Sequence, residues 1–192
     1  MTTPLMIPAE TVNKRFDSDY YVEGYATTFD DPYMLFEWDG VKYYERIAAD
    51  ALTGADTSDV IFQYNHAGKV FARISNHTLG LEADKKGLFT FADLSKSAAA
   101  KELHEEIRNG LVTKMSWAFT VAEDAYNRDT HTRTITKIKK VYDVSAVSIP
   151  ANDNTSISAR SYFDGVIERE KAERLERRKQ ILKIFLEMEN RR

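Results

Sequence analysis

The stretch GLVTKMSWAFT, from Gly110 to Thr120, predicts the end of a helix followed by a strand with a serine at its centre. Side chains alternate across a strand, so the large apolar residues share one face, which we assign to the core: Met115, Trp117, Phe119 and Val121. Ser116 lies on the opposite face, beside Ala118. A small neighbour leaves room for another group to approach the Ser116 hydroxyl. A strand serine with no partner is a poor nucleophile, so a chemical role requires a base nearby.

On both sides of this stretch, the body is predicted to consist mostly of antiparallel strands. Runs of β-branched and aromatic residues bounded by turn residues place strands at 20–28, 35–38, 41–44, 59–65, 69–75, 78–83, 88–94, 112–125 and 133–149. Asp39-Gly40 is a strong two-residue hairpin signal. His66-Ala67-Gly68 is predicted as a second short turn.

Two longer helices and one short helix are predicted. Ser97 is placed to cap a helix over 98–109, with Gly110 just past its end. Apolar residues recur every four positions on this helix: Ala99, Leu103 and Ile107. Charges of both signs at helical spacing predict a long helix over 166–189, and a short helix is predicted over 48–53.

These elements predict a mainly β protein with helices (α+β). Because many strands with few helices would leave long exposed edges, we expect an antiparallel closed or nearly closed β-barrel surrounded by a few helices. We divide the chain into an N-terminal extension over 1–19, a barrel domain over 20–160 and a charged amphipathic helix over 161–192.

Composition excludes several classes of protein. The 192 residues include no cysteine, which excludes disulfides, thiolate metal sites and a cysteine nucleophile. No His pair has metal-ligand spacing, so we expect neither a metal nor a cofactor. The net charge of −3 gives no nucleic-acid signature. No signal-peptide or membrane-spanning run is present, so we expect no membrane partner.

Among the four histidines, His66 is the strongest candidate for a general base. It ends the run VIFQYNH, where Phe62, Tyr64 and His66 are expected on one strand face, and a strand end is positioned yet reachable. Imidazole side chains ordinarily titrate near about 6.5, which suits proton transfer at neutral pH. An ordinary turn histidine is the alternative. The others lie in polar surroundings and are expected to face solvent: His77, His104 and His131.

A carboxylate in an apolar strand is the candidate partner for that base. In the run VYDVSAVSIPAN, one strand face is predicted to hold Val141, Asp143, Ser145, Val147 and Ile149. Burying the Asp143 carboxylate is costly unless it is paired. The alternatives are an exposed carboxylate on an edge strand, or one neutralised by Lys139 or Lys140.

Taken together, these motifs resemble a known family. In chain order they are VEGYA, YERIAADAL, a strand ending in NH, GLFTFADL, a helix ending in RNG, MSWAF and YDVSAVSIPAN. They resemble the prohead (capsid-maturation) serine proteases of tailed bacteriophages, a family similar to the herpesvirus assembly proteases. The resemblance covers about residues 20–157, and it implies a herpesvirus-protease-like barrel.

The resemblance assigns roles to three residues. It implies that Ser116 is the nucleophile, that His66 is the general base and that Asp143 orients His66. Two positions depart from the family pattern, which usually has glycine where this chain has Ala118 and often glutamate where it has Asp143. Aspartate is one methylene shorter, so the strands must lie closer together or a water must bridge the gap.

The implied function is a serine endopeptidase of phage capsid maturation. It would cleave the scaffolding segment of the capsid protein precursor, and itself, inside the assembling prohead in the host cytoplasm. A homo-oligomer or dimer is expected, without nucleic acid. The alternative is a catalytically inactive internal scaffold or capsid-assembly protein with the same fold.

The C-terminal helix leaves its role open. From Val166 to Arg192 there are nine Lys and Arg against six Asp and Glu. Interspersed glutamates and the lack of interleaved aromatics disfavour nucleic-acid binding. The helix is either an element for oligomerisation or capsid targeting, a stub left by self-cleavage, or a helix packed on the barrel by its apolar stripe.

Overall fold

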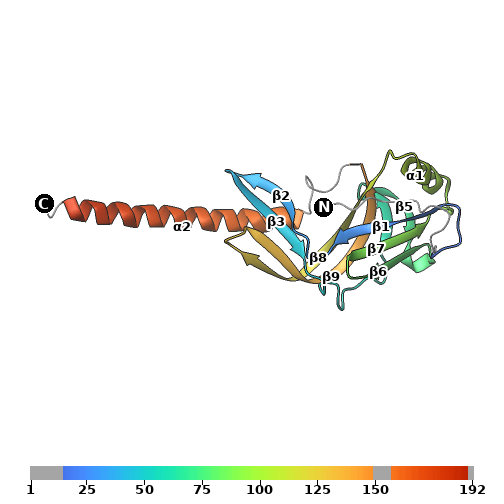
Figure 1. Ribbon diagram of the computed structural model, residues 1–192, viewed down its shortest axis with the longest axis horizontal. Coiled ribbons are helices and arrows are strands. Elements are labelled where there is room, and N and C mark those ends of the chain that lie inside the picture. The colour runs from blue at the N-terminus through green and yellow to red at the C-terminus, as the bar shows by residue number, and fades with distance from the viewer. Residues whose placement is uncertain (1–14, 149–156, 190–192) are drawn as a thin grey trace. The chain divides into compact units, whose positions relative to one another are not determined.

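The computed structural model describes residues 15–148 and 157–189, of which 157–164 and 184–189 are described as backbone only. The chain divides into two compact units, Met1–Asp153 and Asn154–Arg192. The first contains two β-sheets and helix α1 (Ala98–Arg108), and the second contains helix α2 (Ile157–Glu189) (Figure 1). The predicted mixed class, mostly strands with helices, is therefore confirmed.

The smaller sheet has three antiparallel strands in the order β1-β7-β6. They are β1 (Tyr21–Thr28), β6 (Leu79–Ala83) and β7 (Gly87–Asp93). β6 and β7 form a hairpin around the Asp84–Gly87 turn, where the Asp84 carboxylate accepts hydrogen bonds from the backbone N–H groups of Lys86 and Gly87.

The larger sheet has six strands and is mixed rather than antiparallel. Its order is β2-β3-β9-β4-β5, with β8 also paired to β9. The strands are β2 (Tyr33–Trp38), β3 (Val41–Ile47), β4 (Ile61–Tyr64), β5 (Ala67–Arg73), β8 (Lys114–Asn127) and β9 (Thr132–Val147). β3 and β4 both run parallel to β9. The expectation of a purely antiparallel arrangement is wrong at these two pairs.

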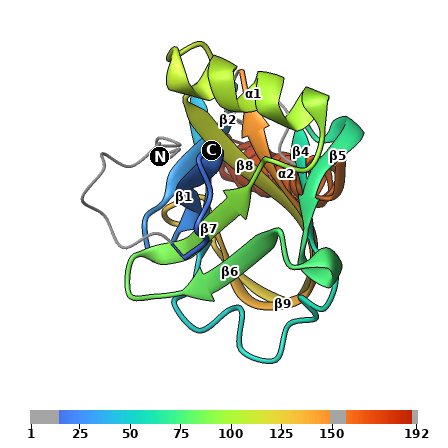
Figure 2. The same cartoon turned by 90° about the vertical axis from the view of Figure 1, so that its right-hand side faces the viewer.

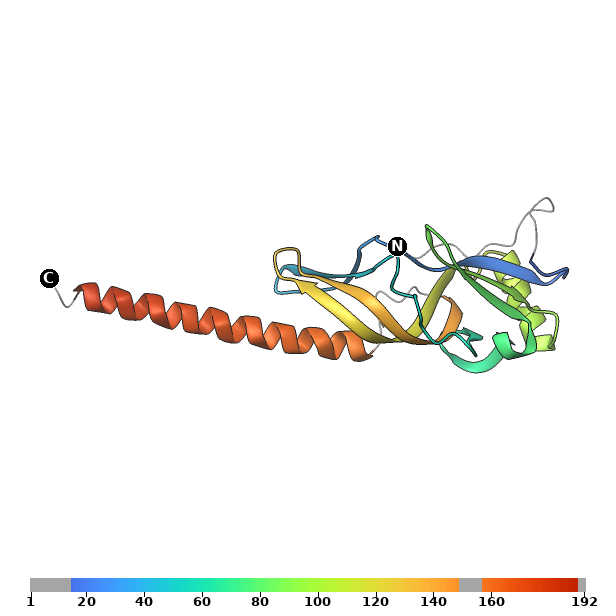
Figure 3. The same cartoon turned by 90° about the horizontal axis from the view of Figure 1, so that it is seen from below.

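β9 organises the larger sheet. Antiparallel pairing with β8 follows β9 along its whole length, as the yellow and gold ribbons in Figure 3 show. The other edge of β9 is shared, first by β3 at residues 132–135 and then by β4 at residues 143–146. β9 curves strongly between these two partners (Figure 2). A carboxylate near the end of β9 therefore lies between two paired strands, not on an edge.

The barrel itself is not confirmed. Within residues 15–148, no backbone ladder joins the three-stranded sheet to the six-stranded sheet. The prediction assumed that edge strands close on one another by hydrogen bonding. Here the two sheets are instead joined through their apolar side chains.

That shared core joins both sheets to α1. Its fully or nearly fully buried members include Val22, Phe62, Leu88, Leu103, Met115 and Val144. The buried stripe of α1 consists of Ala100, Leu103, His104 and Ile107. Ser97 caps α1 as predicted, because its hydroxyl accepts a hydrogen bond from the Ala100 backbone N–H at 3.1 Å.

One predicted helix and one predicted helix boundary need correction. Residues 48–53 contain hydrogen-bonded turns and no helix, with the Ala51 and Thr53 N–H groups donating to Ala48 and Asp50. Helix α2 begins at Ile157, earlier than the predicted start at Val166. None of the helices in the described ranges is long and apolar enough to cross a membrane.

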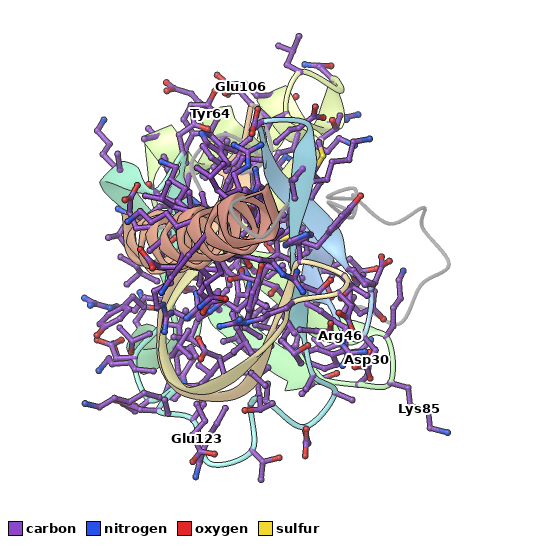
Figure 4. All side chains as sticks on the ribbon, turned by 90° about the vertical axis from the view of Figure 1, so that its left-hand side faces the viewer. Asp30, Arg46, Tyr64, Lys85, Glu106 and Glu123 are labelled. Atoms are coloured by element: carbon purple, nitrogen blue, oxygen red, sulfur yellow. The ribbon has the colours of Figure 1, made fainter. Side chains whose placement is uncertain are left out.

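A buried charge cluster joins β2, β3, β8 and β9. The Tyr33 hydroxyl donates to Glu45 at 2.5 Å, and Arg133 lies between the Glu45 and Asp124 carboxylates at 3.3 and 2.5 Å. Burial raises the pKa of Glu45, while hydrogen bonds from Tyr33 and Arg133 oppose that rise. Surface pairs such as Asp30 with Arg46, 3.9 Å apart and adjacent in Figure 4, are far more exposed.

Candidate active site

The candidate site is built on the last third of β9, where β8 and β4 flank it. In the β8–β9 register, Ser116 pairs with Ser145 and Ala118 pairs with Asp143. On the other edge of β9, Asp143 pairs with Ile61 of β4. Paired residues point to the same side of a sheet. Ser116 and Asp143 therefore share one face and are diagonal neighbours on adjacent strands.

A β-bulge at Tyr142 separates this face from the core. Ala118 pairs with Asp143, but the next residue of β8, Phe119, pairs with Val141, so Tyr142 is the extra residue. Val141 is consequently turned to the core side and is fully buried. The prediction that Val141 and Asp143 share a face is wrong, because the bulge reverses the alternation between them.

His66 is presented by a two-residue turn between β4 and β5. Tyr64 pairs with Ala67 across the turn, and both turn residues, Asn65 and His66, have positive φ angles of 51° and 55°. Two positive φ angles in a two-residue loop are the pattern of a type I′ hairpin turn. The turn is thus Asn65-His66, one residue earlier than the predicted His66-Ala67-Gly68.

This turn also decides which way His66 faces. Strict alternation would place His66 on the same face as Phe62, and Phe62 is fully buried in the core. The left-handed turn breaks the alternation and brings the imidazole to the face that carries Asp143. The predicted common face is therefore wrong, although the choice of His66 as a reachable histidine agrees with its exposure.

Asn65 anchors the turn to the end of β9. Its backbone N–H donates to the Ala146 carbonyl at 2.9 Å, and its side-chain oxygen accepts from the Ser148 backbone N–H at 3.0 Å. Its side-chain nitrogen donates to the Ser148 hydroxyl at 3.2 Å. Sequence reasoning did not single out Asn65. Its place before His66, at a position where a left-handed backbone is needed, was the available signal.

The pairing of His66 with Asp143 is the central contact of the site. Nδ1 of His66 lies 2.6 Å from Oδ1 of Asp143. The Asp143 side chain is only 9% exposed, whereas that of His66 is 32% exposed. The exposed-carboxylate alternative is therefore wrong for Asp143. So is neutralisation by Lys139 or Lys140, because among the described residues the ion-pair partner of Asp143 is His66, and the Lys140 ammonium pairs with Asp56 at 2.8 Å.

Ser116 completes the candidate set by position. Its residue is 6% exposed, and diagonal neighbours on paired strands are separated by about 7–8 Å. Both Ser116 and His66 are described residues, and no hydrogen bond joins them. Catalytic hydrogen bonds are often long in unliganded enzymes and tighten when substrate binds.

The neighbouring serine cannot substitute as nucleophile. Ser145 is fully buried, and its hydroxyl donates to Asp143 Oδ1 at 2.7 Å. A group without exposure cannot reach a peptide carbonyl. Ser116, which is 6% exposed, is the more accessible of the two serines.

The other histidines have structural surroundings. His104 is buried on α1 and packs edge-on against Tyr20, with ring centroids 5.3 Å apart, so its predicted solvent exposure is wrong. His131 lies 3.0 Å from the Tyr126 hydroxyl. His77 is exposed at the end of a short 3₁₀ turn, as expected. Among the described residues, no three His, Asp or Glu side chains are grouped to hold a metal ion.

Comparison with known proteins agrees with the motif resemblance. Residues 8–168 match the family model described as "Caudovirus prohead serine protease". The chain is 28% identical over 145 residues to the "Prohead protease" of Enterobacteria phage HK97, covering 75% of this chain and 61% of that relative. The chain thus spans less than two thirds of the curated relative's length. No solved structure matches it. Since the family model covers most of the chain, the protein belongs to the caudovirus prohead serine protease family.

Proposed function

We propose that this protein is a serine endopeptidase in which Ser116 attacks the scissile peptide bond and His66 is its general base. The hydrogen bond between His66 and the buried Asp143 is the observation that carries the proposal. A carboxylate paired to one ring nitrogen leaves the other nitrogen to receive a proton, which is the arrangement that base catalysis needs.

The proposed chemistry follows from the two ends of the imidazole. With Nδ1 protonated and donating to Asp143, Nε2 carries the lone pair. Nε2 takes the Ser116 proton as Oγ attacks the substrate carbonyl, and the imidazolium then protonates the leaving amine. Water hydrolyses the acyl-enzyme by the same proton path in reverse. Asp143 stabilises the imidazolium, and the shorter aspartate suffices because β4 and β9 are directly paired.

The proposed substrates come from the family. The HK97 relative is named a prohead protease, and we infer that this chain cleaves the scaffolding segment of a capsid protein precursor, and itself, inside the assembling prohead. Residues 20–160 would carry the activity, and the chain would form a homo-oligomer or dimer. Residues 161–192 would act as an appended helix, either for oligomerisation or capsid targeting or as the remnant of self-cleavage.

The test is precursor processing by matched variants. The chain is co-expressed with a capsid precursor that carries its scaffolding segment, as wild type, Ser116→Ala and the surface control Ser58→Ala. Cleavage is expected with wild type and Ser58→Ala and not with Ser116→Ala. Processing by Ser116→Ala would refute the serine mechanism.

A second measurement distinguishes an inactive scaffold protein from an active enzyme whose substrate is missing from the cleavage assay. The missing hydrogen bond between Ser116 and His66 is compatible with the inactive-scaffold alternative as well as with an unliganded enzyme. A serine-directed fluorophosphonate forms a covalent adduct only with an activated hydroxyl. A single adduct on Ser116, lost in His66→Gln, supports the enzyme. A folded wild-type chain without any adduct supports the scaffold.

A further inference from the structure

Ser145 occupies a special place between the candidate nucleophile and the carboxylate. It is two residues after Asp143 on β9 and is the direct cross-strand partner of Ser116. Its residue has no exposed surface. It therefore lies inside the candidate site without access to a substrate.

The hydroxyl of Ser145 meets the same oxygen that His66 meets. Ser145 Oγ donates to Asp143 Oδ1 at 2.7 Å, and His66 Nδ1 lies 2.6 Å from that oxygen. An aspartate carboxylate can rotate about its last side-chain bond, since that torsion is broad. Two donors converging on one oxygen from different directions fix the rotation and the oxygen that faces the imidazole.

Packing alone does not require a hydroxyl at this position. Burying a hydroxyl without a partner costs free energy, whereas alanine would fill nearly the same space. The hydrogen bond to Asp143 offsets this free-energy cost for Ser145. Thr90, equally buried on β7, has a hydroxyl with no hydrogen-bond partner among the described residues and offers a matched contrast.

We propose that Ser145 is a positioning residue that holds the Asp143 carboxylate so that Oδ1 faces His66 Nδ1. The inference rests on the proposed serine mechanism and adds a fourth member to it. Ser145 acts through Asp143 and touches neither the substrate nor the attacking oxygen.

The kinetic test compares Ser145→Ala with Thr90→Val. Losing a hydrogen bond to a charged group predicts a kcat about 10- to 30-fold lower for Ser145→Ala. KM should be unchanged because Ser145 has no access to substrate, and Thr90→Val should keep both constants. Ser145→Thr, which retains the hydroxyl, should recover most of kcat.

A spectroscopic test separates positioning from a general loss of structure. In the inactive Ser116→Ala background, the His66 Nδ1 proton gives a downfield ¹H resonance when it is bonded to Asp143. Adding Ser145→Ala should shift or broaden that resonance, adding Thr90→Val should not, and adding Asp143→Asn should abolish it. This measurement needs no turnover and reports directly on the hydrogen bond.

The outcomes are distinguishable. Wild-type kcat in Ser145→Ala, or a lower kcat with an unchanged resonance, overturns the positioning role while the serine mechanism stands. Retained cleavage by Ser116→Ala overturns the mechanism and this inference with it. A lower kcat, an altered resonance and rescue by threonine together support the role of Ser145.

Discussion

Nδ1 of His66 lies 2.6 Å from Oδ1 of Asp143, although 77 positions separate the two residues in the sequence. The parallel pairing of β4 with β9 makes this contact, because Ile61 is the register partner of Asp143 and the turn at the end of β4 folds His66 back toward it. The catalytic proposal depends on this contact.

Asp143→Asn should abolish most activity while leaving the fold intact. An amide in place of the carboxylate favours the wrong imidazole tautomer, and the equivalent change in a serine-protease triad lowers kcat by about 10⁴-fold. The measurement is kcat for precursor cleavage beside the thermal unfolding midpoint. Asp59→Asn, which alters an exposed carboxylate paired with Arg73, is the control and should keep full activity. Near-normal turnover by Asp143→Asn would show that His66 needs no carboxylate.

Cleavage should fall as the solution is made acidic. A protonated His66 has no lone pair to accept the Ser116 proton, so activity requires the neutral imidazole. kcat/KM should therefore be lower in acid than at neutral pH, and the profile is measured over the interval from about pH 5 to 8. The measurement is the pH profile of a purified, folded sample. A flat profile across the interval would exclude His66 as the base.

Replacing Asn65 should lower both stability and kcat, because Asn65 forms the turn that presents His66 and anchors that turn to Ser148. Asn65→Gly keeps the left-handed backbone but loses the side-chain bonds to Ser148, at a cost of about 1 kcal/mol. Asn65→Ala should cost about 1 kcal/mol more, because alanine is strained at positive φ. Both should lower kcat, since His66 is held less firmly, and urea unfolding gives the stability.

The matched control for Asn65 is Asp39→Ala. Asp39 also has a positive φ, 51°, in a two-residue hairpin turn between β2 and β3. Its replacement should reduce stability without changing kcat. Equal kcat losses in both turns would mean that global stability, not the placement of His66, explains the effect.

Arg133→Met should destabilise the fold in a pH-dependent way. Removing the cation leaves Glu45 and Asp124 without their shared partner, and breaking a buried pair costs about 3–5 kcal/mol. Burial already raises the pKa of Glu45, and losing Arg133 raises it further. A carboxyl whose folded-state pKa exceeds its unfolded value destabilises the fold as pH rises through that pKa. The loss should therefore be larger at neutral pH than in mild acid.

Chemical unfolding at two pH values measures this effect. The control is Lys137→Met, which removes an exposed pair with Glu123, a residue that projects from the surface in Figure 4. Exposed pairs contribute about 0–1 kcal/mol, so the control should change little at either pH. A loss for Arg133→Met that grows in acid would contradict the assigned direction of the Glu45 pKa.

The sequence alone predicted the local elements that short-range chemistry specifies. The cap at Ser97 and the Asp39-Gly40 turn depend on side-chain and backbone preferences within a few residues. Strand patterning singled out Ser116, His66 and Asp143 as candidates, and the order of the motifs, which single residues do not supply, assigned their roles. By contrast, His104 was expected in solvent because its neighbours in sequence are charged, and its burial depends on how α1 packs against Tyr20.

What only the tertiary structure decided is which side chains meet. Alternation along a strand, the rule available from sequence, failed at the Tyr142 bulge and at the Asn65-His66 turn, because each inserts a change of direction that the pattern does not encode. The parallel pairing of β4 with β9 and the meeting of Ser145 with Asp143 depend on register between distant segments. Register is set by the joint packing of both sheets, so the sequence determined the elements and the candidate groups, and the fold determined their contacts.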